Sequence, residues 1–125
     1  MTSRVLQNCR VLVVEDEYYQ GREAKAVLEN AGATVLGPTL DEAMVGTWLQ
    51  EDAFDMAVID LNLRHGPRFS VARTLQRHSI PFLILTGYDR GIVPSEFARV
   101  PVVEKPVDTR QIVQKLHALL PNHTS

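Results

Sequence analysis

Long apolar runs, signal-peptide features and paired cysteines are all missing from this chain of 125 residues. No apolar stretch approaches the roughly 20 residues that a membrane-spanning helix needs, and Met1–Arg10 has no apolar segment of the kind that a secretory signal contains. The single cysteine, Cys9, excludes an internal disulfide framework and suits a reducing compartment. We therefore expect a cytoplasmic protein with no membrane attachment.

Strong charge of either sign is missing as well. Thirteen Lys and Arg residues nearly balance fifteen Asp and Glu residues, and the basic residues are scattered along the chain. This pattern gives no reason to expect a nucleic-acid partner. The length suits one domain with a sizeable core. We expect that domain over residues 9–121, with residues 1–8 as an N-terminal extension and 122–125 as a frayed tail.

The chain does contain four short apolar runs, and each leads to a polar residue of a different kind. Such runs are typical of buried parallel strands. Because the carboxyl ends of parallel strands meet at one edge of a sheet, we expect an acidic cluster, a lone aspartate, a hydroxyl and a lysine to meet there. The runs are Val11–Val14 before Glu15, Asp16 and Glu17; Met56–Ile59 before Asp60; Phe82–Leu85 before Thr86; and Val102–Val103, which leads through Glu104 to Lys105 and Pro106.

Helical patterns separate these runs. Gly21, inside the first pattern, predicts a close approach of that helix to the sheet, because glycine costs about 1 kcal/mol relative to alanine in a helix. Between the last two runs, Gly91 and Pro94 leave room for at most a short helix over 94–99. Strands alternating with helices predict an α/β protein with a doubly wound, five-stranded parallel sheet and a weak or short fourth helix. The other helices are predicted over 18–31, 70–78 and 108–120 and from the capping box Thr39–Glu42 to about Gln50, and the remaining strand over Thr34–Gly37.

Three carboxylates, those of Glu15, Asp16 and Asp60, are expected close together at the sheet edge. Like charges at short distance raise pKa values and destabilise the fold unless something neutralises them. Mg²⁺ is suited to this task, since it binds one or two carboxylates together with water and phosphate oxygens. The Asp60 carboxylate could then form an aspartyl phosphate, with Lys105 and the Thr86 hydroxyl binding phosphoryl oxygens.

Each of these residues also has an ordinary structural interpretation. Acidic residues after a strand often form the first turn of the next helix, and a lone aspartate such as Asp60 is commonly a turn former or a cap. Thr86 could belong to a tight turn, and Lys105 to a charged edge. The presence of all four signals at strand ends, in this order, favours phosphoryl chemistry over four separate coincidences.

From Cys9 to Leu120 the chain resembles the receiver domain of bacterial two-component response regulators. The resemblance rests on Glu15-Asp16, on the Val-Ile-Asp-Leu that ends at Leu61, on the strand end at Thr86 and on Lys105-Pro106. It implies a flavodoxin-like fold and a phosphoryl group taken from a histidine kinase or a phosphotransfer protein. Such a protein is not an enzyme with a separate substrate, although it should catalyse its own phosphorylation and dephosphorylation.

The resemblance also assigns roles within the site. Asp60 would be the phosphoacceptor, and Asp16 would contact Mg²⁺ directly with Glu15 assisting. The backbone carbonyl of Asn62 would be the remaining metal ligand. Thr86 and Lys105 would bind the phosphoryl oxygens, as their chemistry already suggests.

A narrower resemblance is to a receiver subgroup with Thr-Gly-Tyr after the fourth strand, here Thr86-Gly87-Tyr88. Members of this subgroup share Gly-Pro after the second strand and Asp-Leu-Asn-Leu around the phosphoacceptor. Many are stand-alone receivers and others are fused to sensor kinases. We expect a stand-alone receiver that acts on an unknown downstream protein through direct contacts, with a receiver segment of a hybrid kinase as an alternative.

One departure from the family pattern concerns the output signal. Most receivers have an aromatic residue three positions before the lysine, where this chain has Val102. Tyr88 is a candidate substitute, and we expect Tyr88 or the segment 87–100 to change position on phosphorylation. The weak fourth helix belongs to the surface through which receivers usually dimerise, so a monomer is favoured.

Two rival functions come from other classes. A Mg²⁺-dependent phosphatase with an aspartyl-phosphate intermediate typically needs a second acid two residues after the nucleophile, and Asn62 occupies that position. A flavodoxin-like nucleotide or flavin binder needs a glycine-rich phosphate loop after the first strand. There the run from Glu15 to Glu17 would repel phosphate in the absence of metal.

Overall fold

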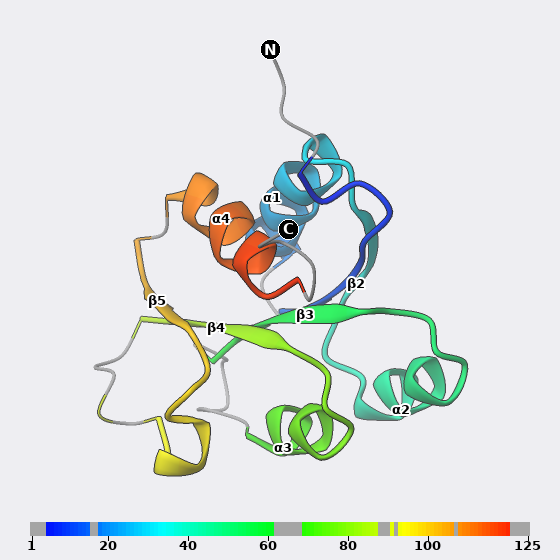
Figure 1. The fold of residues 1–125 in the computed structure, drawn as a ribbon, viewed down its shortest axis with the longest axis vertical. Helices are drawn as coiled ribbons and strands as arrows, with labels where there is room; N and C mark the ends of the chain where they lie inside the picture. Colours follow the sequence, from blue (N-terminus) through cyan, green and yellow to red (C-terminus); the bar gives the residue numbers. More distant parts are fainter. Residues whose placement is uncertain are drawn as a thin grey trace.

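The computed structural model describes residues 5–15, 18–61, 69–87, 91, 93–106 and 108–120, except for the side chains of 18–20. Its five strands form one parallel sheet in the order β2-β1-β3-β4-β5. Helices cover both faces, with α1 and α4 on one side and α2 and α3 on the other (Figure 1). The strands are β1 (Arg10–Val14), β2 (Thr34–Thr39), β3 (Met56–Asp60), β4 (Phe82–Thr86) and β5 (Val102–Glu104); the helices are α1 (Tyr18–Asn30), α2 (Glu42–Gln50), α3 (Ser70–Arg77) and α4 (Thr109–Ala118).

This architecture confirms the predicted doubly wound α/β fold. The expected weak helix between β4 and β5 is a single 3₁₀ turn, η2 (Ser95–Phe97), so the label α4 belongs to the last helix of the chain. None of the described helices has the length and apolar composition needed to cross a bilayer.

The strands appear as unbroken apolar runs in the sequence because both faces of the sheet are buried. Successive side chains point to opposite faces of a strand. In β1, Val11 and Val13 pack under α1 and α4, whereas Leu12 and Val14 pack on the side of α2 and α3. The same alternation holds in β3 and β4, where Met56, Val58, Leu83 and Leu85 belong to the first core and Ala57, Ile59, Phe82 and Ile84 to the second.

Gly21 makes the close approach that the sequence predicts, and its neighbour is Pro38 of β2. A Cβ atom built on Gly21 would lie 2.5 Å from Cγ and 2.7 Å from Cβ of Pro38. Any larger residue at position 21 would therefore push α1 away from β2.

Two local predictions were wrong. Strand β2 does not end at Gly37 but continues to Thr39, which is possible because β2 is an edge strand, where proline is tolerated. The capping box was assigned to the wrong residue. The N-cap of α2 is Asp41, whose side chain accepts hydrogen bonds from the backbone nitrogens of Ala43 and Met44, while Thr39 Oγ1 accepts from the backbone nitrogen of Asp41.

The remaining helix predictions hold to within two residues. Asp108 caps α4 by accepting from the backbone nitrogen of Arg110, as expected. The domain boundary at residue 9 stays a prediction. Leu6, inside the predicted N-terminal extension, is fully buried, and its backbone nitrogen donates to the carbonyl of Ala31 at 2.9 Å.

Candidate functional site

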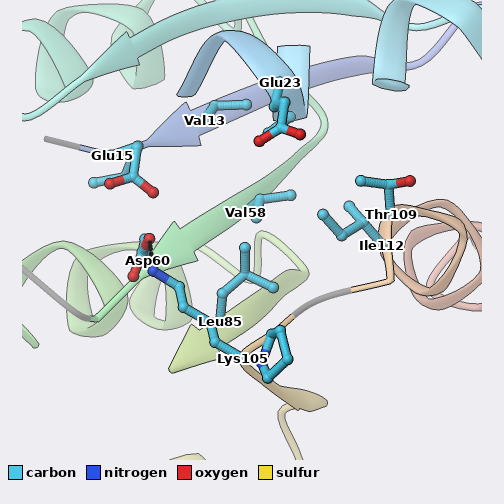
Figure 2. Close-up of a pocket in the computed structure, with 12 residues that line it drawn as sticks. Val13, Glu15, Glu23, Val58, Asp60, Leu85, Lys105, Thr109 and Ile112 are labelled. Carbon is cyan, nitrogen blue, oxygen red and sulfur yellow. Dashed lines mark hydrogen bonds and ion pairs between the residues drawn. The ribbon is translucent and has the colours of Figure 1, made fainter. Parts of the chain in front are cut away.

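Asp60, the last residue of β3, is buried with only 1% of its surface exposed. Lys105, which directly follows β5, places its Nζ 2.6 Å from Asp60 Oδ2. In Figure 2 the lysine side chain extends along the ends of the strands and its ammonium points at the carboxylate. A buried carboxylate needs such a partner, because an unpaired charge in the interior is strongly destabilising.

Thr86, the last residue of β4, is completely buried. Leu85 pairs with Asp60 in the β3–β4 register, so Thr86 lies one residue beyond the phosphoacceptor candidate. The carbonyl of Thr86 accepts a hydrogen bond from the backbone nitrogen of Lys105 at 2.8 Å. This main-chain hydrogen bond therefore holds Thr86 and Lys105 next to each other, as the sequence predicts.

Glu15 follows β1 and is 8% exposed. Its backbone nitrogen donates to the carbonyl of Thr39 at 3.1 Å, which holds it beside the end of β2. Figure 2 shows the carboxylates of Glu15 and Asp60 at the ends of two neighbouring strands. The structure thus gathers Glu15, Asp60, Thr86 and Lys105 at one edge of the sheet, whereas Asp16 and Asn62 lie outside the described residues.

A cavity of about 270 Å³ opens beside these residues, between α1 and α4. Its walls are largely apolar, from Val13, Val58 and Leu85 of the sheet and Ile112 of α4. Sequence reasoning missed two polar residues that line it, Glu23 of α1 and Thr109 of α4, which Figure 2 shows across the cavity from Asp60. The capping aspartate at 108 was the one available signal, because it sets Thr109 at the first helical position.

The charge of this lining suits a divalent cation. Three carboxylates, from Glu15, Glu23 and Asp60, accompany the ammonium of Lys105. Glu15 and Asp60 are nearly buried hard oxygen donors at adjacent strand ends, which fits the ligand preference of Mg²⁺. The described residues alone contain no group of three side chains that could hold a metal, and the third predicted acid, Asp16, is outside them.

Other residues singled out in the sequence lie away from this cluster or outside the description. Val102 begins β5 and packs, half-buried, against the core under α2 and α3; Tyr88 is not among the described residues.

His78 is exposed, with its Nδ1 2.9 Å from the carbonyl oxygen of Thr74. Burial, and secondarily the charge of Asp55, raises the pKa of the Cys9 thiol, so nothing indicates a reactive cysteine.

No protein-family model matches this sequence, and neither does any curated protein. Solved structures do match. A response regulator receiver protein from Sinorhizobium medicae WSM419 has a TM-score of 0.76 over 94% of this chain and 98% of that one, at 21% identity, which shows the fold. The receiver domain of the hybrid histidine kinase CckA has a TM-score of 0.67 at 20% identity, over 87% of this chain and 96% of that one.

The similarity to SdrG goes beyond the fold. The solution structure of SdrG from Sphingomonas melonis Fr1 is 31% identical over 89% of this chain and 95% of SdrG, with a TM-score of 0.73. The BeF3-activated conformation of SdrG from Pseudomonas melonis Fr1 is 32% identical over 96% of this chain and 99% of that one, also at 0.73. The chain belongs to the response regulator receiver family. In this receiver, four residues that follow or end strands lie together at one edge of the sheet, as the sequence predicts: Glu15, Asp60, Thr86 and Lys105.

Proposed function

We propose that this receiver accepts a phosphoryl group on Asp60 from a histidine kinase or a phosphotransfer protein and signals through protein contacts. The observation that carries the proposal is the buried ion pair of Asp60 with Lys105, at 2.6 Å, on the edge of a parallel sheet where Thr86 ends β4 and Glu15 directly follows β1. A carboxylate that served only as a cap or a turn former would have no need of a lysine supplied from two strands away.

The chemistry follows from the positions of these side chains. A carboxylate oxygen of Asp60 attacks phosphorus, the phosphorus–nitrogen bond of the donor's phosphohistidine breaks, and the imidazole leaves. Lys105, which faces the carboxylate before transfer, then faces the phosphoryl oxygens, and the Thr86 hydroxyl donates to another of them. The burial of Asp60 limits the access of bulk water to the acyl phosphate.

Mg²⁺ is the proposed cofactor. Glu15, Asp16, Asp60 and the backbone carbonyl of Asn62 would hold it, and when bound it supplies neutralisation of the charge on the transferred group. In the absence of a cation, the negative charges of Glu15 and Asp60 at neighbouring strand ends would repel each other.

The finer assignment is a bacterial, cytoplasmic, stand-alone receiver of the Thr-Gly-Tyr subgroup that works as a monomer. It is supported by Gly87 directly after Thr86 at the end of β4, by the Gly37-Pro38 pair in β2, and by the similarity to SdrG. Its output would pass to a downstream protein through contacts made by the segment between β4 and β5.

Phosphorylation by acetyl phosphate, followed by intact mass, tests the proposal. The wild type should gain one phosphoryl group, about 80 Da, only when Mg²⁺ is present, and Asp60→Asn should gain none. Asp55→Asn is the matched control, because it makes the same substitution at the opposite end of β3 and should still be phosphorylated. A phosphorylated Asp60→Asn variant, with the adduct mapped elsewhere, would refute the assignment.

A further inference from the structure

Phe97 of η2, in the connection between β4 and β5, is buried. Only 1% of its surface is exposed. Its ring stacks on Phe69, just before α3, with centroids 6.0 Å apart and an interplanar angle of 26°. It also meets Phe82 of β4 edge-on at the same separation. Aromatic contacts of this kind stabilise by more than their buried area alone, so η2 is anchored firmly for a single turn of helix.

Polar contacts fasten the same turn to α3. Arg73 donates from Nε to Glu96 Oε1 at 2.9 Å and from Nη2 to Oε2 at 3.2 Å, a bidentate pair. Its guanidinium also lies 5.8 Å from the centroid of the Phe69 ring. Gln76 Nε2 donates to the carbonyl of Glu96 at 2.8 Å. We call Phe69, Arg73, Gln76, Glu96 and Phe97 the α3–η2 joint.

The α3–η2 joint is formed by residues of two chain segments, and each segment begins at the candidate site. One segment starts after Asp60 and reaches the joint at Phe69; the other starts after Thr86 and reaches it at Glu96. Beyond η2 the chain returns to the site, since the nitrogen of Val100 donates to the carbonyl of Phe97 at 2.9 Å and β5 begins two residues later. The joint therefore connects the segment that follows Asp60 with the segment that lies between Thr86 and Lys105.

This chain also lacks the aromatic residue that most receivers have three positions before the lysine. With Val102 at the start of β5, no aromatic side chain there can turn toward Thr86. Phe97 is the only aromatic residue that the structure describes between Thr86 and Val102. It is already fixed against α3, so it cannot act as a freely turning reporter and instead ties two segments together.

We propose that the α3–η2 joint transmits the phosphorylation state of Asp60 to the β4–β5 connection, so that η2 and α3 respond as one unit. The inference rests on the proposed function of Asp60. When Lys105 and the Thr86 hydroxyl bind the phosphoryl oxygens, the ends of β4 and β5 shift, and η2 cannot follow them without carrying Arg73 and Phe69 along. Coupling of this kind is reciprocal, so the joint must in turn affect how well the site binds a phosphoryl group.

The test uses beryllofluoride with Mg²⁺ as the probe, with ¹⁹F NMR to detect the bound fluoride and amide NMR to follow α3 and η2. In the wild type, binding should shift the amide signals of both elements. In Glu96→Gln and Phe97→Leu, beryllofluoride should still bind but with an affinity changed by about fivefold or more, and the shifts in η2 and α3 should no longer occur together. Glu96→Gln is expected to fold, because the Glu96 side chain is 44% exposed.

Asp55→Asn is the control for a general loss of stability. It breaks another bidentate arginine–carboxylate pair, that of Arg10 with Asp55, neither of which belongs to α3 or η2, and it should leave both the affinity and the shifts at wild-type values. Beryllofluoride binding with identical affinity and identical shifts in wild type and both joint variants would overturn the inference alone. Absence of any bound fluoride in the wild type would overturn the proposed function, and this inference with it.

Discussion

The backbone nitrogen of Lys105 donates a 2.8 Å hydrogen bond to the carbonyl of Thr86, so the last residue of β4 and the residue after β5 are linked through main-chain atoms. Their side chains are consequently free to change partners without loss of the strand pairing. Substitution of either side chain should therefore alter the chemistry of the site while leaving β4 and β5 paired.

Lys105→Gln should slow phosphorylation by acetyl phosphate by about a hundredfold, since it removes the cation that faces the developing charge. The rate of mass gain under saturating Mg²⁺ measures this. Lys115→Gln, on the exposed side of α4, is the control and should react at the wild-type rate. Equal rates for wild type and Lys105→Gln would show that the ion pair with Asp60 has no part in the transfer.

Millimolar Mg²⁺ should raise the melting temperature at neutral pH, by about 4 °C for a binding contribution near 1 kcal/mol. The cation relieves repulsion between Glu15 and Asp60, so Glu15→Gln should show a smaller increase. Glu29→Gln, an exposed substitution on α1, should behave as the wild type does. A wild-type melting curve that Mg²⁺ leaves unmoved would mean that the acidic residues do not form a metal site.

Gly21→Ala and Gly46→Ala should change stability in opposite directions, although both lie inside helices. Alanine usually stabilises a helix by up to about 1 kcal/mol relative to glycine, and Gly46 of α2 has nothing within 4 Å of a built Cβ. At Gly21 the same atom would overlap the rigid ring of Pro38, for an expected destabilisation of about 2 kcal/mol. Urea unfolding of the two variants provides the comparison, and a stabilised Gly21→Ala would argue against the contact between α1 and β2.

Asp55 should make the stability of the protein depend on pH in the acid range. Its hydrogen bonds with Arg10 lower the pKa of Asp55 from its ordinary value of 3.8. A carboxyl whose pKa is lowered by folding stabilises the native state above its unfolded pKa, and this contribution disappears as the pH falls through the lowered value. The advantage of the wild type over Asp55→Asn should therefore be constant above about pH 5 and shrink below about pH 4.

Urea midpoints measured from pH 6 down to about pH 3 would reveal this change. The contribution should be below about 1 kcal/mol, because the pair is partly exposed to solvent. An advantage that stays constant across the whole range would mean that the Arg10–Asp55 pair does not persist in solution.

The strands of the sheet and the residues at their carboxyl ends were predictable because each depends on a short, continuous stretch of sequence. Parallel strands buried on both faces, such as Val11–Val14 and Phe82–Thr86, appear in the sequence as short, nearly continuous apolar runs. The rule that such strands end at a common edge predicts that Asp60, Thr86 and Lys105 lie together.

Features that depend on contacts between distant segments were not predictable in the same way. A close approach at Gly21 was predictable from the helical pattern, but its neighbour Pro38 was not. The predicted capping box began at Thr39, but β2 extends to that residue and Asp41 caps α2 instead. Nothing in the local pattern connected Arg73 with Glu96, because that pair exists only once α3 and η2 are packed together.

The two outer strands of the sheet have a consequence for the behaviour of the protein at high concentration. One edge strand, β2, contains Pro38, which has no amide hydrogen to offer, and the other, β5, is only three residues long. Short or proline-containing edges give an incoming strand little to pair with, and natural proteins use them against aggregation. The fold therefore resists sheet-to-sheet growth between molecules at the very edges where an open parallel sheet is most exposed to it.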